Sequence, residues 1–137
     1  MPLAPDWSLQ KAVFAALSAD ATLTGLIGPD RIHDGAPQSE TFPYLTFGQS
    51  LVRDWSTTSD TGAEHVLTIH VWSRAAGKKE ALAIMRAVRS VLHDRPLALE
   101  DHHLVNLRHE FSDAARDGDG ETMHGIVRFR AVTEAVA

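Results

Sequence analysis

Residues 64–73 read Glu64-His65-Val66-Leu67-Thr68-Ile69-His70-Val71-Trp72-Ser73, and this stretch decides the fold. Leu67, Ile69 and Val71 share one face of an extended chain, because successive side chains of a β-strand point to opposite faces. The other face carries Val66, Thr68, His70 and Trp72. The stretch therefore predicts a strand with one face in the core and an amphipathic face turned outward.

Three further segments show the same alternation, at residues 44–51, 104–111 and 123–133, and a short extended segment is expected at 31–33. In the last of them Arg128 and Arg130 point away from the core. The residues expected in the core are Leu45, Phe47 and Leu51 in the first segment, Val105, Leu107 and Phe111 in the second, and Val127, Phe129 and Ala131 in the third.

Apolar residues recur at helical spacing in two segments, residues 8–26 and 78–93, and each segment ends at residues that stop a helix, including Pro29 and Pro96. The first stripe comprises Leu9, Val13, Ala16 and Leu17, widened by Phe14, and the second comprises Ala81, Ile84, Met85, Val88, Val91 and Leu92. We therefore expect an α+β fold, a mainly antiparallel four- to five-stranded sheet packed by two helices on one face. All 137 residues are expected to form a single domain, 1–137.

Three polar segments link these elements. Residues 34–43 are expected to form an irregular loop, and residues 53–63 a hairpin loop that holds Trp55. Residues 112–121 contain Asp117-Gly118-Asp119-Gly120, a turn signal, because Gly and Asp accept left-handed backbone angles.

Composition narrows the class of protein. The chain has no cysteine, so neither a disulfide framework nor a thiolate metal site is available, and a reducing cytoplasm suits it. Its N-terminus lacks the basic head and apolar run of a signal peptide, and no segment has the length of a membrane span. The net charge of −5 argues against non-specific nucleic-acid binding and favours protein partners.

Motifs of common enzymes are not found. Gly77-Lys78 lacks the earlier glycine and the following Ser or Thr of a phosphate-binding loop, and glycines 118, 120 and 125 do not have dinucleotide-binding spacing. No serine lies in a nucleophile-elbow sequence. We expect neither a catalytic residue nor a cofactor.

Two metal sites are weaker alternatives. His102, His103, His109 and His124 would meet if the last two strands were neighbours, but a site also needs convergent ligands with supporting contacts. The acidic residues of segment 112–121 suggest calcium, yet Ala115 interrupts the ligand series of a calcium loop. Surface histidines and a solvated turn are favoured over both sites.

The outer face of the predicted sheet is the remaining candidate for function. Trp72, Arg128 and Arg130 lie on it, and either a helix or loop of the same chain covers it or a partner subunit does. Trp55 leaves a second choice open. A tryptophan in a polar loop either packs against its own sheet or serves as an anchor for a partner.

The chain resembles the tail-completion, or tail-terminator, proteins of long-tailed phages and gene transfer agents, a family long catalogued as a domain of unknown function. The resemblance covers nearly the whole chain and rests on an ordered set of segments, none decisive alone. They are Phe42-Pro43-Tyr44-Leu45-Thr46-Phe47-Gly48, Asp54-Trp55-Ser56-Thr57, residues 64–74, Gly77-Lys78-Lys79-Glu80-Ala81, residues 116–120 and residues 124–131.

The resemblance implies a structural protein of the virion, assembled in the bacterial cytoplasm. Its subunits would form a hexameric ring at the head-proximal end of the tail tube, stop polymerisation of the major tail protein and join the tail to the head-side connector. DNA would pass through the lumen without specific binding. We expect ring contacts at Trp72, Arg128 and Arg130. Docking to the tube or connector is expected in loops 53–63 and 113–121, which hold Asp54, Trp55, Asp117 and Asp119.

Two alternatives remain. A head–tail connector or minor tail protein of the same particle would share this size and composition. A small metal-dependent hydrolase would instead use the histidines and acids of the last two strands, among them His109 and His124.

Overall fold

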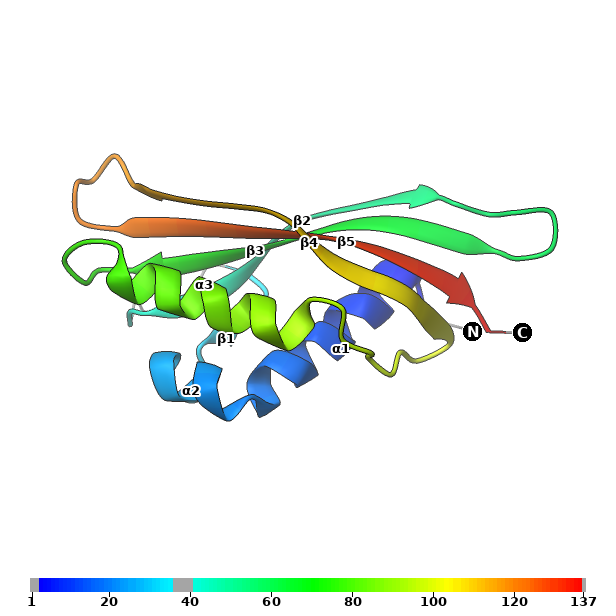
Figure 1. Cartoon of the computed structure of the whole chain (residues 1–137), viewed down its shortest axis with the longest axis horizontal. Coiled ribbons are helices and arrows are strands. Elements are labelled where there is room, and N and C mark those ends of the chain that lie inside the picture. Colours follow the sequence, from blue (N-terminus) through cyan, green and yellow to red (C-terminus); the bar gives the residue numbers. More distant parts are fainter. Residues whose placement is uncertain (1–2, 36–40, 137) are drawn as a thin grey trace.

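The helices of this protein lie on one side of its sheet (Figure 1). The computed structural model describes residues 3–35 and 41–136, so the expected loop 34–43 lies partly outside the described residues. The elements in chain order are α1 (Pro5–Ala19), α2 (Ala21–Ile27), β1 (Ile32–His33), β2 (Tyr44–Asp54), β3 (Gly62–Ser73), α3 (Lys79–Leu92), β4 (His102–Arg116) and β5 (Met123–Ala135).

The sheet has the strand order β1-β2-β3-β5-β4. The two-residue β1 runs parallel to β2, and every other neighbouring pair is antiparallel. The expectation of an α+β fold with a mainly antiparallel sheet is therefore confirmed. Because β3 and β5 lie in the middle, β1 and β4 are the two edge strands.

The core lies between the inner face of the sheet and the helices. Leu67, Ile69 and Val71 of β3 are buried there, as the alternation of that stretch predicts. Helix α3 packs against β3, β4 and β5, while α1 and α2 both pack against α3. The most completely buried large side chains include Phe129, Leu9, Leu17, Leu23, Leu45, Ile69, Ile84, Leu92 and Leu107.

The single helix expected over residues 8–26 is in fact two helices, so the sheet is packed by three helices and not two. Asp20 separates them. Its backbone is extended, and its carboxylate accepts a hydrogen bond from the backbone N–H of Leu23 at 2.9 Å. The side chain thus caps α2, which the spacing of apolar residues alone does not reveal.

Leu51, Val105 and Phe111 were expected in the core and are exposed instead. The register shifts within β2 between Phe47 and Ser50, and within β4 at two places, between Leu104 and Asn106 and between His109 and Phe111. Each irregularity inserts a residue without a partner and turns the following side chains to the opposite face. The predictions for these three residues were wrong because they assumed unbroken alternation.

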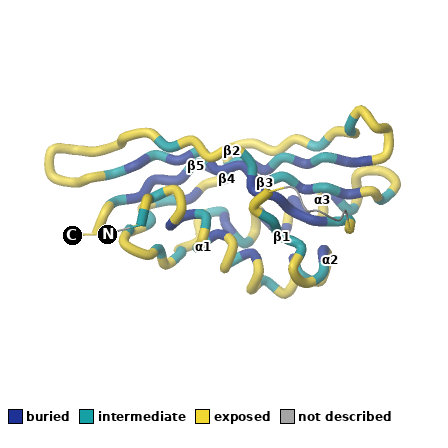
Figure 2. Tube along the Cα trace, turned by 180° about the vertical axis from the view of Figure 1, so that it is seen from behind, coloured by how far each residue is buried: buried dark blue, intermediate teal, exposed yellow. Residues whose placement is uncertain are grey.

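Two hairpins project at opposite ends of the sheet, β2–β3 at one end and β4–β5 at the other (Figure 1). Their tips are exposed (Figure 2). The strands are longer than expected, so the connecting loops shorten to residues 55–61 and 117–122. In the described part of the chain, no helix has the length and hydropathy needed to cross a membrane.

Candidate assembly surface

The side of the sheet away from the helices is the main candidate surface, and we call it the open face. Among residues 3–35 and 41–136 no helix or strand covers it (Figure 1). The register of the strands places on it Tyr44, Thr46, Leu51 and Arg53 of β2, Glu64, Val66, Thr68, His70 and Trp72 of β3, His124, Ile126, Arg128, Arg130 and Val132 of β5, and Asn106, Arg108, Phe111 and Asp113 of β4.

Glu64 organises one end of the open face. Its side chain is only 11% exposed and bridges Arg53, at 3.0 Å, and Arg130, at 2.6 Å. A carboxylate at this depth needs such partners, because burial penalises an unpaired charge. The guanidinium of Arg130 also lies 5.3 Å from the ring centre of Trp55. Arg130 is thus fixed by contacts on its own chain.

Trp55 packs against its own chain and is also half exposed, so its role as an anchor for a partner stays a prediction. One side of its indole ring meets Arg130, yet 51% of the residue is exposed. Its backbone N–H donates to the carbonyl of Gly62, and the neighbouring Asp54 accepts a hydrogen bond from the Ser56 hydroxyl at 2.6 Å. The loop is held in shape by these bonds and presents an aromatic surface.

Arg128 occupies the middle of the open face. Its guanidinium lies 5.4 Å from the ring centre of Phe111, the side chain that the β4 irregularity turns outward. Its Nε atom is buried and has no hydrogen-bond acceptor among the described residues. An N–H group in that state is destabilising unless an acceptor from another molecule reaches it.

A row of stacked aromatic side chains lies at the other end of the open face. The indole of Trp72 is stacked on His124, with ring centres 4.0 Å apart and planes inclined by 8°. Its other ring neighbours are His70, at 5.9 Å, and Tyr44, at 6.2 Å. The Trp72 Nε1–H donates to the Thr46 hydroxyl at 3.0 Å. Trp72 is therefore a supporting side chain of this face and only partly accessible.

His70 and His124 form a contact that was not expected from the sequence. Their facing ring nitrogens, Nδ1 and Nε2, lie 2.6 Å apart, and the Nδ1 of His124 is 3.7 Å from a carboxylate oxygen of Asp117. Burial, and then the proximity of His124, lowers the pKa of His70. The pairing of β3 with β5 explains the contact, because it places both histidines on the same face as diagonal neighbours: His70 lies opposite Ile126, and His124 lies opposite Trp72.

Asp119 shapes the tip of the β4–β5 hairpin. Its carboxylate accepts hydrogen bonds from the backbone N–H groups of Glu121 and Thr122, at 2.9 and 2.8 Å, and from the Thr122 hydroxyl at 2.7 Å. These bonds, those from Thr122 first, lower the pKa of Asp119 to about 2. Asp119 therefore stays charged and holds the turn, while the hairpin presents its outer side chains.

The four histidines proposed as metal ligands have different surroundings. His109 contacts Ser112, His124 contacts His70, and His102 contacts the carbonyl of Leu3. Although β4 and β5 are neighbours, His109 lies opposite Phe129 and His124 opposite Ala115, well apart along the pair. Within the described ranges no cluster of three His, Asp or Glu side chains is arranged to hold a metal ion.

An amphipathic sheet face that no described helix covers, with a projecting hairpin at each end, is typical of a structural subunit that binds other proteins. Residues 11–134 match the model of the family described as tail completion protein gp17. The chain belongs to this family of structural phage tail proteins.

Two relatives agree with that assignment. The tail completion protein gp17 of Bacillus phage SPP1 is 26% identical over 123 residues, which cover 90% of each chain. A chain in the solved virion of a native gene transfer agent particle is 32% identical and superimposes with a TM-score of 0.87, covering 94% of this chain and 96% of that one. The resemblance recognised in the sequence is confirmed at the level of family, tail-completion role and virion.

Proposed function

We propose that this protein is a tail terminator. It forms a hexameric ring at the head-proximal end of a phage-type tail tube, ends polymerisation of the major tail protein and joins the tail to the head-side connector. The observation that carries the proposal is the open face, which combines an unpaired Arg128 N–H with exposed apolar side chains. The family assignment supplies the tail-completion role.

The ring itself is supported by the shape of the sheet. Its two edge strands are unlike: β1 has two residues and pairs only with β2, whereas β4 has fifteen residues with one side free of any described strand. Unlike edges favour head-to-tail contacts between copies, and such contacts close into a ring when the rotation between copies permits.

The open face and the hairpins are assigned different partners. Arg128 and Arg130, together with Trp72 at the other end of the same face, contribute contacts between copies. The hairpins contact the tail tube and the connector: Asp54 and Trp55 belong to one tip and the pair Asp117 and Asp119 to the other. The net charge of −5 suits a ring whose lumen lets DNA pass without adhering.

We further propose that the protein works without catalysis. The separate surroundings of its histidines support this view over a metal-dependent hydrolase. A head–tail connector or minor tail protein is the second candidate, because the matching solved chain comes from the virion of a gene transfer agent particle.

Deletion of the gene in a particle-producing strain tests the proposal. Electron microscopy should show intact heads together with tails that are overlong, unattached or missing. Overlong tubes separate a terminator from a connector, whose loss leaves tube length unchanged. Attached tails of normal length in the deletion strain would refute the proposal.

A further inference from the structure

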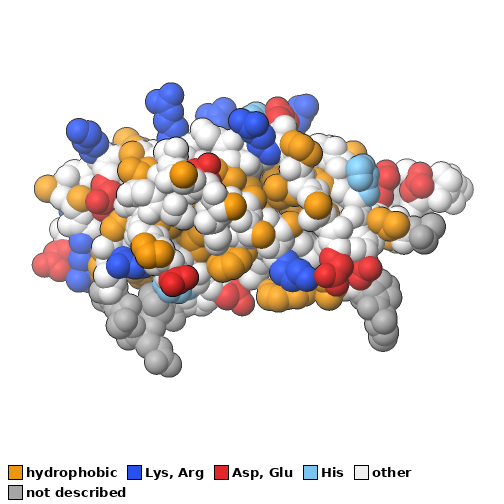
Figure 3. Space-filling view, turned by 90° about the horizontal axis from the view of Figure 1, so that it is seen from below, with side chains coloured by type: hydrophobic (Ala, Val, Ile, Leu, Met, Phe, Trp, Pro, Cys, Tyr) orange, Lys and Arg blue, Asp and Glu red, His pale blue; other side chains and the backbone are white. Residues whose placement is uncertain are grey.

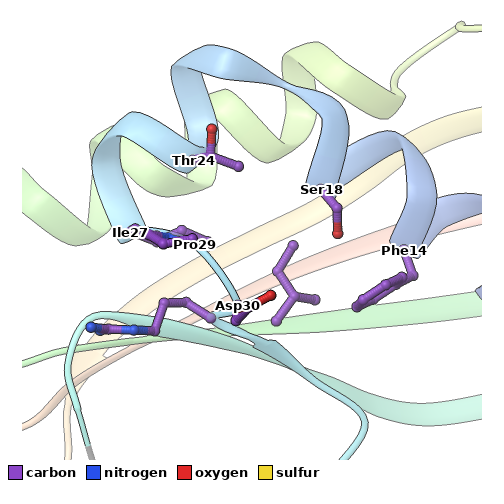
Figure 4. Close-up of a pocket in the computed structure, with 9 residues that line it drawn as sticks. Phe14, Ser18, Thr24, Ile27, Pro29 and Asp30 are labelled. Atoms are coloured by element: carbon purple, nitrogen blue, oxygen red, sulfur yellow. The ribbon is translucent and has the colours of Figure 1, made fainter.

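A shallow hollow lies at the β1 edge of the molecule, where α1, α2 and the turn before β1 meet. Its volume is about 310 Å³. Figure 4 shows Phe14 and Ser18 on one side, Ile27 and Pro29 on the other, and Asp30 between them. Phe14 is 46% exposed although it stands on a helix of the core layer. We call this site the acidic hollow.

The lining of this hollow carries one acidic side chain, Asp30, and one basic side chain, Arg31. Residues 12–30 contain Asp20 and Asp30 and neither lysine nor arginine. The carboxylate of Asp30 is exposed and forms no ion pair with a described residue, whereas Asp20 caps α2. The next residue, Arg31, also lines the hollow, and its guanidinium donates to the carbonyl of Thr41 at 3.3 Å.

A surface of opposite character lies at the other edge of the molecule. The outer side of α3 carries Leu82, 49% exposed, with Arg86 and Arg89 on the following turns. Neither arginine forms an ion pair with any carboxylate in the described part of the chain. Figure 3 shows Lys and Arg side chains gathered along one long edge of the helical side. We call Leu82, Arg86 and Arg89 the basic ridge.

The two surfaces are placed so that one molecule can use both at once. The basic ridge borders a recess of about 600 Å³ that α3 forms with Ser112 of the edge strand β4. The acidic hollow is lined by Ile32 of β1, the opposite edge strand. Two different, complementary patches at opposite edges are what a head-to-tail contact requires, and such contacts generate rings.

We propose that the basic ridge of one copy seats in the acidic hollow of the next copy. Leu82 contacts Phe14, and Arg86 and Arg89 pair with Asp30. The occupant is a second copy of this chain, because the unpaired charges and the half-exposed apolar side chains of one surface match those of the other. This contact lies in the helical layer, separate from the open face, and it rests on the proposed ring.

Charge reversal tests the pairing directly. One variant carries Arg86→Glu and Arg89→Glu, and a second carries Asp30→Arg. Each alone should assemble at least about tenfold more weakly than wild type, since like charges then face each other across the contact. The chain carrying all three substitutions should assemble like wild type, because the pairing is restored with opposite sign.

Mixing the first two variants gives an independent readout. An even-numbered ring accommodates alternating copies, so the equimolar mixture should form rings that neither variant forms alone. Native mass spectrometry of the full chain, with major tail protein added where rings need it, measures the assemblies. The matched controls are Lys11→Glu and Glu100→Arg, exposed charges that line neither surface and lie outside both hairpins, and circular dichroism verifies that each variant is folded.

The outcomes separate this inference from the proposed function. If wild type forms the ring and the folded single-surface variants assemble equally well, or the triple variant fails to recover, the contact is wrong and the ring stands. If wild type forms no ring alone or with major tail protein, both proposals fall.

Discussion

The two faces of the sheet are built from the same strands and differ in almost every property. On β5, Val127, Phe129 and Ala131 turn inward and are completely buried, whereas the alternate residues Arg128 and Arg130 turn outward and stay partly accessible. The inner face is stabilised by apolar packing within the chain. The open face contains an N–H group without an acceptor among the described residues. We therefore attribute the stability of the fold to the inner face, and we propose that the open face serves assembly.

The largest effect is expected from Phe129→Ala on the inner face. Phe129 is fully buried, and removing its ring leaves a cavity in the core. Phenylalanine-to-alanine changes of this kind lower the free energy of unfolding by about 3–5 kcal/mol. Urea denaturation followed by circular dichroism measures the loss. A change below about 1 kcal/mol would mean that the inner face is not the core described above.

A smaller effect is expected from Gly48→Ala, which reaches the open face through the backbone. A β-carbon at Gly48 would collide with the imidazole ring of His70, so the ring must move and its contact with His124 is lost. Overpacking of this kind costs about 1–3 kcal/mol. NMR of the imidazole protons should show both histidines displaced. Unchanged signals for His70 and His124 would contradict the crowding at this position.

The free energy of unfolding should depend on pH differently at buried and at exposed histidines. Burial lowers the pKa of His65, whose Nε2 lies 2.9 Å from the Thr133 hydroxyl, below the ordinary histidine value of 6.5. Above that pH both states are neutral at this site. As pH falls below it the unfolded chain binds the proton first, so the free energy of unfolding should decrease by up to about 1.4 kcal/mol per pH unit.

Thermal unfolding between pH 7 and pH 5 checks this expectation, with His103→Gln as the exposed control. The control should lose stability with falling pH as wild type does. His65→Gln should show a shallower decrease. An equal slope in all three proteins would remove His65 as the cause.

The smallest effect on stability is expected from Trp55→Ala on the β2–β3 hairpin. The contact between its ring and Arg130 is partly exposed, and such cation–π contacts contribute about 0.5–1 kcal/mol. Tail attachment should nevertheless fall, because half of the indole is available to a partner. Counting tailed particles by electron microscopy measures it. Normal attachment together with a clearly lowered melting temperature would make Trp55 a packing residue only.

Alternation and helical spacing predicted much of the fold, including the inward residues of β3 and β5 and the stripe of α3. These patterns gave wrong predictions where a single residue interrupts a strand or a helix. The irregularities in β2 and β4 turn Leu51 and Phe111 outward, and the cap at Asp20 divides the first helix. Neither event changes composition or periodicity enough to be read from one sequence.

Part of the candidate surface could be predicted from the same alternation of side chains. Arg128 and Arg130 follow from alternation within one strand, so their place on the open face was expected and is confirmed; their role between copies stays a prediction. The contact of His70 with His124 joins residues 54 positions apart and needs the pairing of β3 with β5. The acidic hollow needs the break at Asp20, which brings α2 beside β1.

The most direct test of the account is electron cryomicroscopy of purified particles at the junction between tail tube and capsid. The account predicts that density for this chain forms a closed hexameric collar there, with the hairpins directed toward the tube and the connector. A junction that lacks this polypeptide, or that holds it outside any closed collar, would contradict the central claim.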